Sequence, residues 1–446
     1  MGSSHYSSRR PSAEVRCYSS PRIEEMIREI SAFLPNRELA WLFENCFPNT
    51  LDTTLAFHQE HETPDTFIIT GDIPAMWLRD SCAQIWSYLP FVHEDPTLDL
   101  LFQGAIHRQV QCIRLDPYAN AFYSDQRPSP WQTDRTDMKP GVHERKWELD
   151  SLAYFLRLSH GYWQQTGSRQ VFGDQWAEAL GLCVQVITRQ MQADRSAAYR
   201  FQRISDIATE TLPLSGQGNP TRPCGLVASG FRPSDDACIF PYLIPSNAMT
   251  AVCLRNVSQM VQEWGLMELA RDCRSLSDTI DVGIRQWGIG EHGQGLVFYY
   301  EVDGYGGRVF MDDANIPSLL SLPYLGYCPL DDPIYQNTRA LLWSEANPYF
   351  FRSGSYAGIG GPHIGLGFIW PMSLMMWALT SSSEAEIRQA LQVLMATHGG
   401  TGFMHESFHQ DHPDRFTRSW FGWANSLFGE LILHLYRTRP DLLKSV

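Results

Sequence analysis

The chain has 446 residues, 49 of them acidic and 35 basic, which gives a formal charge of −14 at pH 7. Apolar residues make up 43% and charged residues 19%, a globular composition that excludes extensive disorder. The acidic balance argues against nucleic acid or an anionic membrane as partner, and no apolar run approaches the ~18 residues that cross a bilayer.

The first part of the chain, residues 1–22, is polar and rich in Ser and Arg. We expect it to form a disordered N-terminal tail. It contains no apolar segment typical of a secretory signal, so we expect a cytoplasmic protein, with a transit peptide left open. Residues 23–446 contain no Ser-, Gly- or Pro-rich linker, which predicts one domain. The ten cysteines are scattered without a C-x-x-C motif and are interpreted as reduced, mostly buried thiols.

Apolar residues recur mostly at helical spacing along this domain, which predicts about twelve helices. The predicted helices cover residues 22–34, 83–92, 98–115, 148–166, 171–193, 246–265, 267–288, 315–322, 333–343, 366–379, 384–398 and 420–437. Thr97 and Ser383 are predicted N-caps. Strand signals are few and short, at Thr66–Thr70, Leu296–Val302 and Ala198–Phe201. The long loops between helices are dense in Gly, Pro, Trp and Asp, which is typical of loops that build a site.

Aromatic residues are numerous, with 14 Trp, 18 Tyr and 23 Phe. Aromatic rings beside acidic side chains suit sugars, although a large helical core also uses Trp. The first candidate motif, Gly71–Ser81, places Arg79 and Asp80 just after Trp77. An adjacent Arg and Asp can clamp vicinal hydroxyls with charge-assisted hydrogen bonds, and Asp80 can equally be a helix N-cap.

The second motif contains two adjacent carboxylates, Asp235 and Asp236, in the loop Phe231–Ala237. Like charges and partial burial would raise the pKa of one of them and keep it protonated near neutrality, as a general acid requires. A helix cap at Ser234 or Asp235 is the structural alternative.

The third motif is His405-Glu406-x-x-His409, which formally matches the zinc-protease pattern, with Glu430 at an acceptable distance for a third ligand. That pattern requires both histidines on one helix. Glycines at positions 399, 400 and 402 argue against such a helix, so the zinc interpretation is the weaker one.

The remaining candidates lie at predicted helix starts or turns. Lys146 and Asp150 flank Glu148, which fits as a first-turn acid of helix 148–166. Asp312 and Asp313 precede helix 315–322, where capping is an adequate explanation. His363 lies in a glycine-rich turn, where a single histidine is more often structural.

Six motifs in order together resemble glycoside hydrolase family 125, from about residue 30 to the C-terminus. They are Gly71–Ser81, Lys146–Leu152, Phe231–Met249, Met311–Leu320, Gly361–Trp370 and Gly402–Glu430. The resemblance implies an all-α fold, an (α/α)6 barrel over residues 23–446 with long rim loops. It implies an exo-acting, inverting α-1,6-mannosidase without metal or cofactor, acting on N-glycan or mannan fragments, and we expect a monomer. The family also resembles the glucoamylase-like clan.

The resemblance also implies roles for single residues. Asp235 is expected to be the general acid, with Asp236 as the alternative or as a substrate-binding neighbour that raises the pKa of Asp235. Glu406 is expected to be the general base, with His405 helping to keep it ionised. The substrate-binding candidates are Arg79 and Asp80, which would grip the terminal mannose, and more weakly Trp77, Lys146, Asp150, Asp312, Asp313 and His363. Inversion requires one protonated and one ionised carboxyl with room for a water between them.

Three alternative functions remain open at the level of sequence. One is another inverting glycosidase of the glucoamylase-like barrel clan, since the axial 2-hydroxyl of mannose cannot be inferred from residue patterns. The second is a zinc metallopeptidase that uses His405 and His409. The third is a non-catalytic sugar-binding barrel, against which the presence of both expected carboxylates counts.

Overall fold

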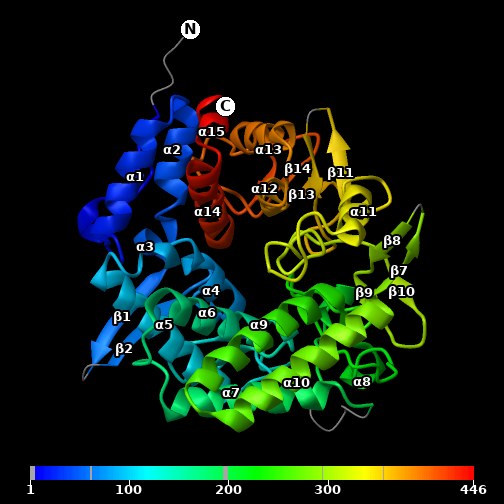
Figure 1. Ribbon diagram of the computed structural model, residues 1–446. Coiled ribbons are helices and arrows are strands. Elements are labelled where there is room, and N and C mark those ends of the chain that lie inside the picture. Colours follow the sequence, from blue (N-terminus) through cyan, green and yellow to red (C-terminus); the bar gives the residue numbers. More distant parts are fainter. Residues whose placement is uncertain (1–5, 61–62, 194–198, 294, 355) are drawn as a thin grey trace.

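Five helices that are buried on most sides form the inner layer of the molecule. They are α4 (Leu78–Trp86), α6 (Leu149–Thr166), α9 (Ile244–Glu263), α12 (Pro371–Leu379) and α14 (Gly422–Thr438). In α12 every residue from Pro371 to Ala378 is buried, and α9 buries 15 of its 20 residues. A helix that is apolar all round belongs in a core. The inner helices follow one another around a ring (Figure 1). This computed structural model describes residues 6–60, 63–193, 199–293, 295–354 and 356–446.

The outer layer consists of helices that bury one side and expose the other. In α10 (Met267–Gly283) the buried residues Ala270, Cys273, Ser277 and Ile280 recur at helical spacing. The other long helices are α1 (Pro21–Phe33), α2 (Arg37–Cys46), α5 (Pro96–Leu115), α7 (Asp174–Gln190), α11 (Pro333–Leu342) and α13 (Glu384–Ala396). Short helices are α3 (Asn49–Thr53), α8 (Pro213–Gly216), α15 (Pro440–Lys444), a π-helix at Ile284–Gly288, and 3₁₀ turns at Ala13–Val15, Leu89–Phe91 and Ala208–Glu210.

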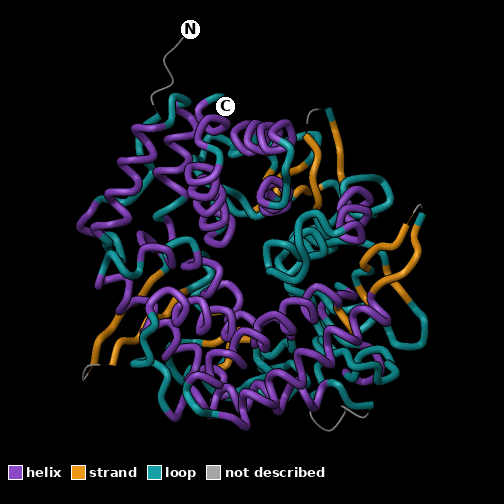
Figure 2. Tube along the Cα trace, viewed as in Figure 1, coloured by secondary structure: helices purple, strands orange, loops and turns teal. Residues whose placement is uncertain are grey.

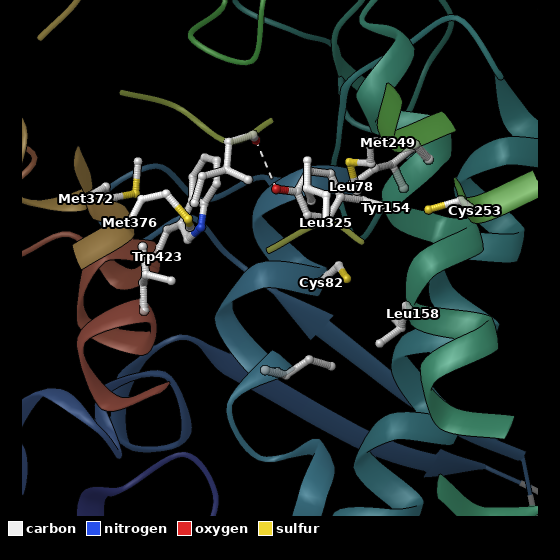
Figure 3. Packing of buried hydrophobic residues seen from close by; sticks show 14 of the residues in the cluster. Leu78, Cys82, Tyr154, Leu158, Met249, Cys253, Leu325, Met372, Met376 and Trp423 are labelled. Carbon is white, nitrogen blue, oxygen red and sulfur yellow. Dashed lines mark hydrogen bonds between the residues drawn. The ribbon is translucent and has the colours of Figure 1, made fainter. Parts of the chain in front are cut away.

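Helix α14 lies near the C-terminal end of the chain. It closes the ring by packing against α2, α3 and α4, which lie near the N-terminal end. Asn425 donates to Asn49 over 3.0 Å, and Ser426 donates to the carbonyl of Gln84. Apolar side chains of α4, α6, α9, α12 and α14 point toward one another inside the ring (Figure 3). The same residues thus build one continuous core and bring distant segments of the chain together.

Within the described residues, the strands form six small sheets (Figure 2). Three are antiparallel hairpins: β1 (Leu55–Glu60) with β2 (Thr63–Ile68), β7 (Ile289–His292) with β8 (Gly295–Phe298), and β11 (Phe350–Ser353) with β12 (Tyr356–Ile359). Three are three-stranded: β3 (Met76–Trp77), β4 (Ala121–Phe122) and β5 (Val142–Glu144); β6 (Tyr242–Leu243), β9 (Glu301–Val302) and β10 (Arg308–Val309); β13 (Phe368–Ile369), β14 (Ser407–His409) and β15 (Phe416–Thr417). Of the predicted strand Ala198–Phe201, residue 198 lies outside the described residues and 199–201 form a loop.

Eleven of the predicted helices are present, with shifted ends. Helix α4 begins at Leu78, five residues before the predicted start, and α12 begins at Pro371 because β13 occupies the residues before it. The predicted cap at Ser383 is confirmed, since its side chain accepts from the Glu386 amide. The predicted cap at Thr97 is wrong: the side chain of Asp95 caps α5 by accepting from the Thr97 amide.

The predicted helix 315–322 is absent, and residues 312–328 form consecutive turns instead. The carboxylate of Asp312 accepts from the amides of Leu319 and Leu320 at 2.8 and 3.0 Å, which folds the segment back on itself. Tyr154 of α6 donates to the carbonyl of Ile316 over 2.9 Å. These turns take the place of a regular helix beside α6 and α11 (Figure 2).

Residues 6–20, within the segment expected to be a disordered tail, pack against the first helices. Arg10 donates to Asp52 over 2.7 Å and to Glu24 over 3.0 Å, and Trp41 donates to the Ser7 carbonyl over 2.6 Å. A guanidinium shared by two carboxylates holds this segment in place. None of the helices in the described part of the chain is both long and apolar enough to cross a membrane.

Candidate active site

A pocket lies where the N-terminal ends of the inner helices α4, α12 and α14 meet. Trp77, Trp370 and Phe421 line it, and each is the residue that immediately precedes its helix, α4, α12 or α14. The full lining comprises Thr70, Ile73, Trp77, Arg79, Asp80, Pro233, Ser234, Asp235, Asn315, His363, Trp370, Glu406, Arg418, Phe421 and Trp423. One end of the barrel therefore carries the site, as the long loops predicted.

Of the predicted site residues, the structure brings six to this pocket. They are Trp77, Arg79, Asp80, Asp235, His363 and Glu406. These residues come from four separate segments, and Trp77 and Glu406 are 329 positions apart in the chain. Acidic, cationic and aromatic side chains thus surround one cavity, which is the combination that suits a sugar.

A tight turn explains why Asp235, and not Asp236, reaches the pocket. The amide of Asp235 donates to the Arg232 carbonyl over 2.9 Å, and Phe231 pairs with Ala237 across the base of the turn. Asp235 has a φ of +69°, a left-handed conformation that Asp tolerates better than most residues. Its side chain stays 24% exposed, whereas Asp236 is buried behind it.

The remaining candidates lie behind the pocket wall and act on residues that line it. Lys146 donates to the Asp235 carbonyl over 2.9 Å. Asp236 lies 3.6 Å from Nδ1 of His363, and Asp150 accepts from Arg79 over 3.4 Å.

Asp312 and Asp313 have partners in the backbone of their own loop. Asp313 accepts from the amide of Asn315, a lining residue, over 3.0 Å. Asp312 is fully buried and accepts the two amide bonds of its own turn described above, so its role is structural and not ligand binding.

Arg79 is the electrostatic centre of the site. Its Nη1 atom donates to Glu148 over 2.5 Å, its Nη2 atom donates to Asp235 over 3.2 Å, and its Nε atom lies 3.5 Å from Asp80. With Asp150, four carboxyl groups surround one buried guanidinium. Repulsion among four carboxyl groups around one guanidinium, together with their burial, raises the proton affinity of some of them.

The pKa values of these carboxyls follow their burial. Burial raises the pKa of Asp80 to about 6, although Arg79 acts in the opposite direction. Burial likewise raises the pKa of Asp150 to about 6 and that of Glu148 well above its usual range. Near neutral pH the carboxyls around Arg79 are thus not all ionised, and Glu148 is the one held most strongly in its protonated form.

The pKa of Asp235 is lowered, whereas the sequence predicted that Asp236 would raise it. Burial alone would raise the pKa of Asp235. The positive charge of Arg79, the interaction with Glu148 and the positive charges of Lys146 and His363 together hold this pKa below its ordinary value. Asp235 is therefore ionised in the unliganded protein. The neighbouring carboxyl that matters is Glu148, which the motif search treated only as a first-turn acid.

The register of a small sheet sets the surroundings of Glu406. Ser407 of β14 pairs with Thr417 of β15, so Glu406 and Arg418 lie opposite each other at the next position. Nε of Arg418 is 3.3 Å from Glu406, and Nη1 donates to Asp72 over 2.8 Å. Arg418 is thus held between the expected general base and the loop before α4.

His405 does not assist Glu406 as an ion. Its ring stacks on Phe416 with centroids 3.7 Å apart, its Nδ1 atom is 3.0 Å from the Arg418 carbonyl, and burial lowers its pKa. His405 is therefore neutral and positions the strand pair. The helix that a zinc interpretation needs is absent as well, because β14 occupies Ser407–His409. Within the described ranges, no three His, Cys, Asp or Glu side chains form a group that could hold a metal.

Two lining tryptophans offer buried donors to a ligand. Nε1 of Trp77 and Nε1 of Trp370 are buried and have no hydrogen-bond partner among the residues that the structure describes. A buried N–H needs an acceptor, and a ligand with many hydroxyl oxygens supplies one. Trp423, whose ring lies 5.8 Å from the Arg79 guanidinium, adds an apolar face to the same pocket.

Several functional neighbours escaped the sequence analysis. Nδ2 of Asn120 donates to Glu144 and Glu148 over 3.0 Å each and lies 3.4 Å from Asp235, and Arg418 contacts Glu406. Asn120 lies in a loop with no signal of its own. Arg418 was inside the Gly402–Glu430 motif, but only the pairing of β14 with β15 shows that it faces Glu406.

Comparison with known proteins agrees with this geometry. The family model of metal-independent alpha-mannosidases, GH125, matches residues 36–433. The Meiotically up-regulated gene 157 protein of Schizosaccharomyces pombe is 46% identical over 98% of this chain and 89% of its own length. A metal-independent alpha mannosidase of Streptococcus pneumoniae, solved as a non-productive complex with alpha-1,6-mannobiose, superposes with a TM-score of 0.91 at 38% identity, covering 95% of this chain and 100% of that one.

A bacterial glucoamylase, solved with acarbose, shares only the fold, with a TM-score of 0.54 at 13% identity over 92% of this chain and 57% of its own. The expected all-α, (α/α)6-barrel architecture is thereby confirmed. By its family match, its sequence identity and its fold, this chain belongs to glycoside hydrolase family 125, the metal-independent alpha-mannosidases.

Proposed function

We propose that this protein is an exo-acting, inverting α-1,6-mannosidase that releases mannose from the non-reducing ends of N-glycan or mannan fragments. The observation that carries the linkage is the α-1,6-mannobiose bound by the S. pneumoniae relative, whose fold covers nearly the whole chain. Exo action is consistent with a pocket in which Arg79 and Asp80 are each only 3% exposed, so that they would face one terminal sugar.

The proposed mechanism uses two carboxyl groups. Asp235, at the tip of its turn, protonates the glycosidic oxygen, and Glu406, on a different loop, takes a proton from the attacking water. Arg79 and Asp80 hold the hydroxyls of the terminal mannose, and the indole N–H groups of Trp77 and Trp370 donate to further oxygens. Asp236 is the less suitable acid, since it is buried and faces His363.

Proton NMR of α-1,6-mannobiose with the enzyme tests substrate and stereochemistry in one measurement. We expect β-mannose to appear first and to equilibrate later with the α anomer. Early α-mannose would contradict the inverting mechanism and leave the mannosidase. A parallel panel of α-glucosides tests the nearest rival, another glycosidase of the same barrel clan, which would cleave the glucosides faster.

Substitution of the two carboxyls tests their roles. Asp235→Asn and Glu406→Gln are each expected to lower kcat on α-1,6-mannobiose by at least about 10²-fold without unfolding the protein. Asp236→Asn is the matched comparison for the acid. If Asp236→Asn abolished turnover while Asp235→Asn kept it, the assignment of the acid would be reversed.

A further inference from the structure

Glu148 is a buried carboxyl that does not line the pocket and that the two-carboxylate mechanism does not use. It immediately precedes α6 and is fully buried. Nη1 of Arg79 donates to its Oε2 atom over 2.5 Å, Nδ2 of Asn120 donates to its Oε1 atom over 3.0 Å, and Ser151 donates to it over 3.1 Å. Three donors fix this side chain in one orientation.

Asp235 shares two of those partners. Nη2 of the same Arg79 donates to Asp235 over 3.2 Å, and the same Nδ2 atom of Asn120 is 3.4 Å from its Oδ1 atom. The carboxyls of Asp235 and Glu148 therefore lie side by side on the same guanidinium and the same amide group. Two ionised carboxylates so close to each other would repel, so the pair holds one proton between them near neutral pH.

The charges around the pair decide which carboxyl holds that proton. Arg79, Lys146 and His363 are the cations that face Asp235, and they favour its ionised form. Glu148 faces Arg79 too, but complete burial and the carboxyls of Asp235 and Asp150 favour its neutral form. In the free protein the shared proton therefore resides on Glu148.

We propose that Glu148 stores the proton that Asp235 delivers to the glycosidic oxygen, which makes Glu148 a positioning residue for the general acid. The inference rests on the proposed function. A general acid must hold a proton, yet Asp235, the residue best placed to act as the acid, is ionised when the pocket contains no substrate. A proton stored on Glu148 accounts for both facts.

The step balances without any further reactant. As the leaving oxygen approaches Asp235, the shared proton moves from Glu148 to Asp235 and then to that oxygen while its bond to the sugar breaks. Glu406 takes one proton from the attacking water, whose oxygen bonds to the sugar carbon. Glu406 then releases its proton to solvent and the Asp235–Glu148 pair takes one up, so the enzyme returns to its starting state.

A pair of substrates separates this role from a merely structural one. α-1,6-Mannobiose has a leaving group that must be protonated, whereas 2,4-dinitrophenyl α-mannoside releases a stable phenolate without an acid. We expect Glu148→Gln to lower kcat on the mannobiose by about 10²-fold and on the aryl mannoside by no more than a few-fold. In the pH profile of kcat/KM on mannobiose, the alkaline limb of the Glu148→Gln variant should also move to lower pH. The neighbouring carboxyl is then gone, and only cations act on the pKa of Asp235.

The matched control is Glu144→Gln, which removes a buried carboxyl bonded to the same Asn120 and to Arg203. We expect it to leave the ratio of the two substrate activities unchanged. If Glu148→Gln does not fold, Glu148→Asp keeps the acid but withdraws it from Asp235, and the same selective loss should appear in smaller degree.

The outcomes distinguish the two proposals. An equal loss on both substrates in the folded Glu148 variant, with an unmoved alkaline limb, overturns the proton-storage role and leaves the mannosidase. A wild-type protein that cleaves neither mannoside overturns the proposed function and this inference with it.

Discussion

The charge of His363 offers a prediction whose size follows from the structure. Nδ1 of His363 lies 3.6 Å from the Asp236 carboxylate. Burial alone would lower the pKa of His363, but its ion pair with Asp236 and the nearby charges of Asp235 and Glu406 raise it from 6.5 to about 9. At ~1.4 kcal/mol for each tenfold change in proton affinity, this difference contributes about 3 kcal/mol to the free energy of unfolding.

The sign of the effect sets its pH dependence. A group whose pKa is raised in the folded state stabilises the protein fully below its unfolded value, here 6.5, and loses that contribution as the pH rises through 9. We therefore expect His363→Gln to lower the free energy of unfolding by about 3 kcal/mol at pH 6 and by much less at pH 10.

Denaturant unfolding of the wild type and the variant at both pH values measures this difference. His93→Gln, a substitution of an exposed histidine, serves as the control for the loss of an imidazole as such. A destabilisation of the same size at pH 6 and pH 10 would show that His363 acts through packing and not through its charge, and would refute the argument.

Three further predictions concern the loops and the independence from metal. Gly71 has a φ of +100°, and a Cβ there would lie 3.1 Å from the ring of Trp420, so Gly71→Ala should lower the free energy of unfolding by about 1–2 kcal/mol. Gly167→Ala, with φ +63° but open space around it, should lower the free energy of unfolding less because it lacks the clash, and denaturant unfolding of both variants measures the difference. Arg418→Gln removes the cation 3.3 Å from Glu406, and we expect kcat on α-1,6-mannobiose to fall at least about tenfold, as measured by mannose release. Unchanged turnover would mean that Arg418 only holds the two loops together and does not act on Glu406. Dialysis against EDTA should leave kcat unchanged, and recovery of lost activity by zinc would contradict the family assignment.

The helices were largely predictable because their apolar spacing is local information. The starts of α4 and α12 were not, since two-residue strands before them pair with distant segments. The segment 315–322 is apolar enough for a helix, but the bonds from Leu319 and Leu320 to Asp312 hold it in turns. Helix propensity is overridden here by side-chain hydrogen bonds within the loop and by the bond from Tyr154 of α6 to Ile316.

The site was predictable where chemistry shows in neighbouring residues, as in the Arg79–Asp80 and Asp235–Asp236 pairs. The expected influence of Asp236 on Asp235 was wrong, because the turn at Asp235 directs the two side chains apart. The partner that does contact Asp235 is Glu148, 87 positions earlier in the chain. Only the packing of the ring reveals such a pair, since neither sequence distance nor periodicity encodes it.

The closure of the ring by α14 has a consequence for how activity arises during folding. The bond between Arg418 and Asp72 joins residues 346 positions apart, and the pocket includes Trp423 at the start of the closing helix. Contacts of such long sequence separation form late, because the loop between them must first be ordered. A chain with every earlier helix in place but α14 undocked would therefore bind no sugar. In refolding experiments, regained mannose release should lag behind regained helicity, and enzymatic activity would then serve as a reporter of the last step of assembly.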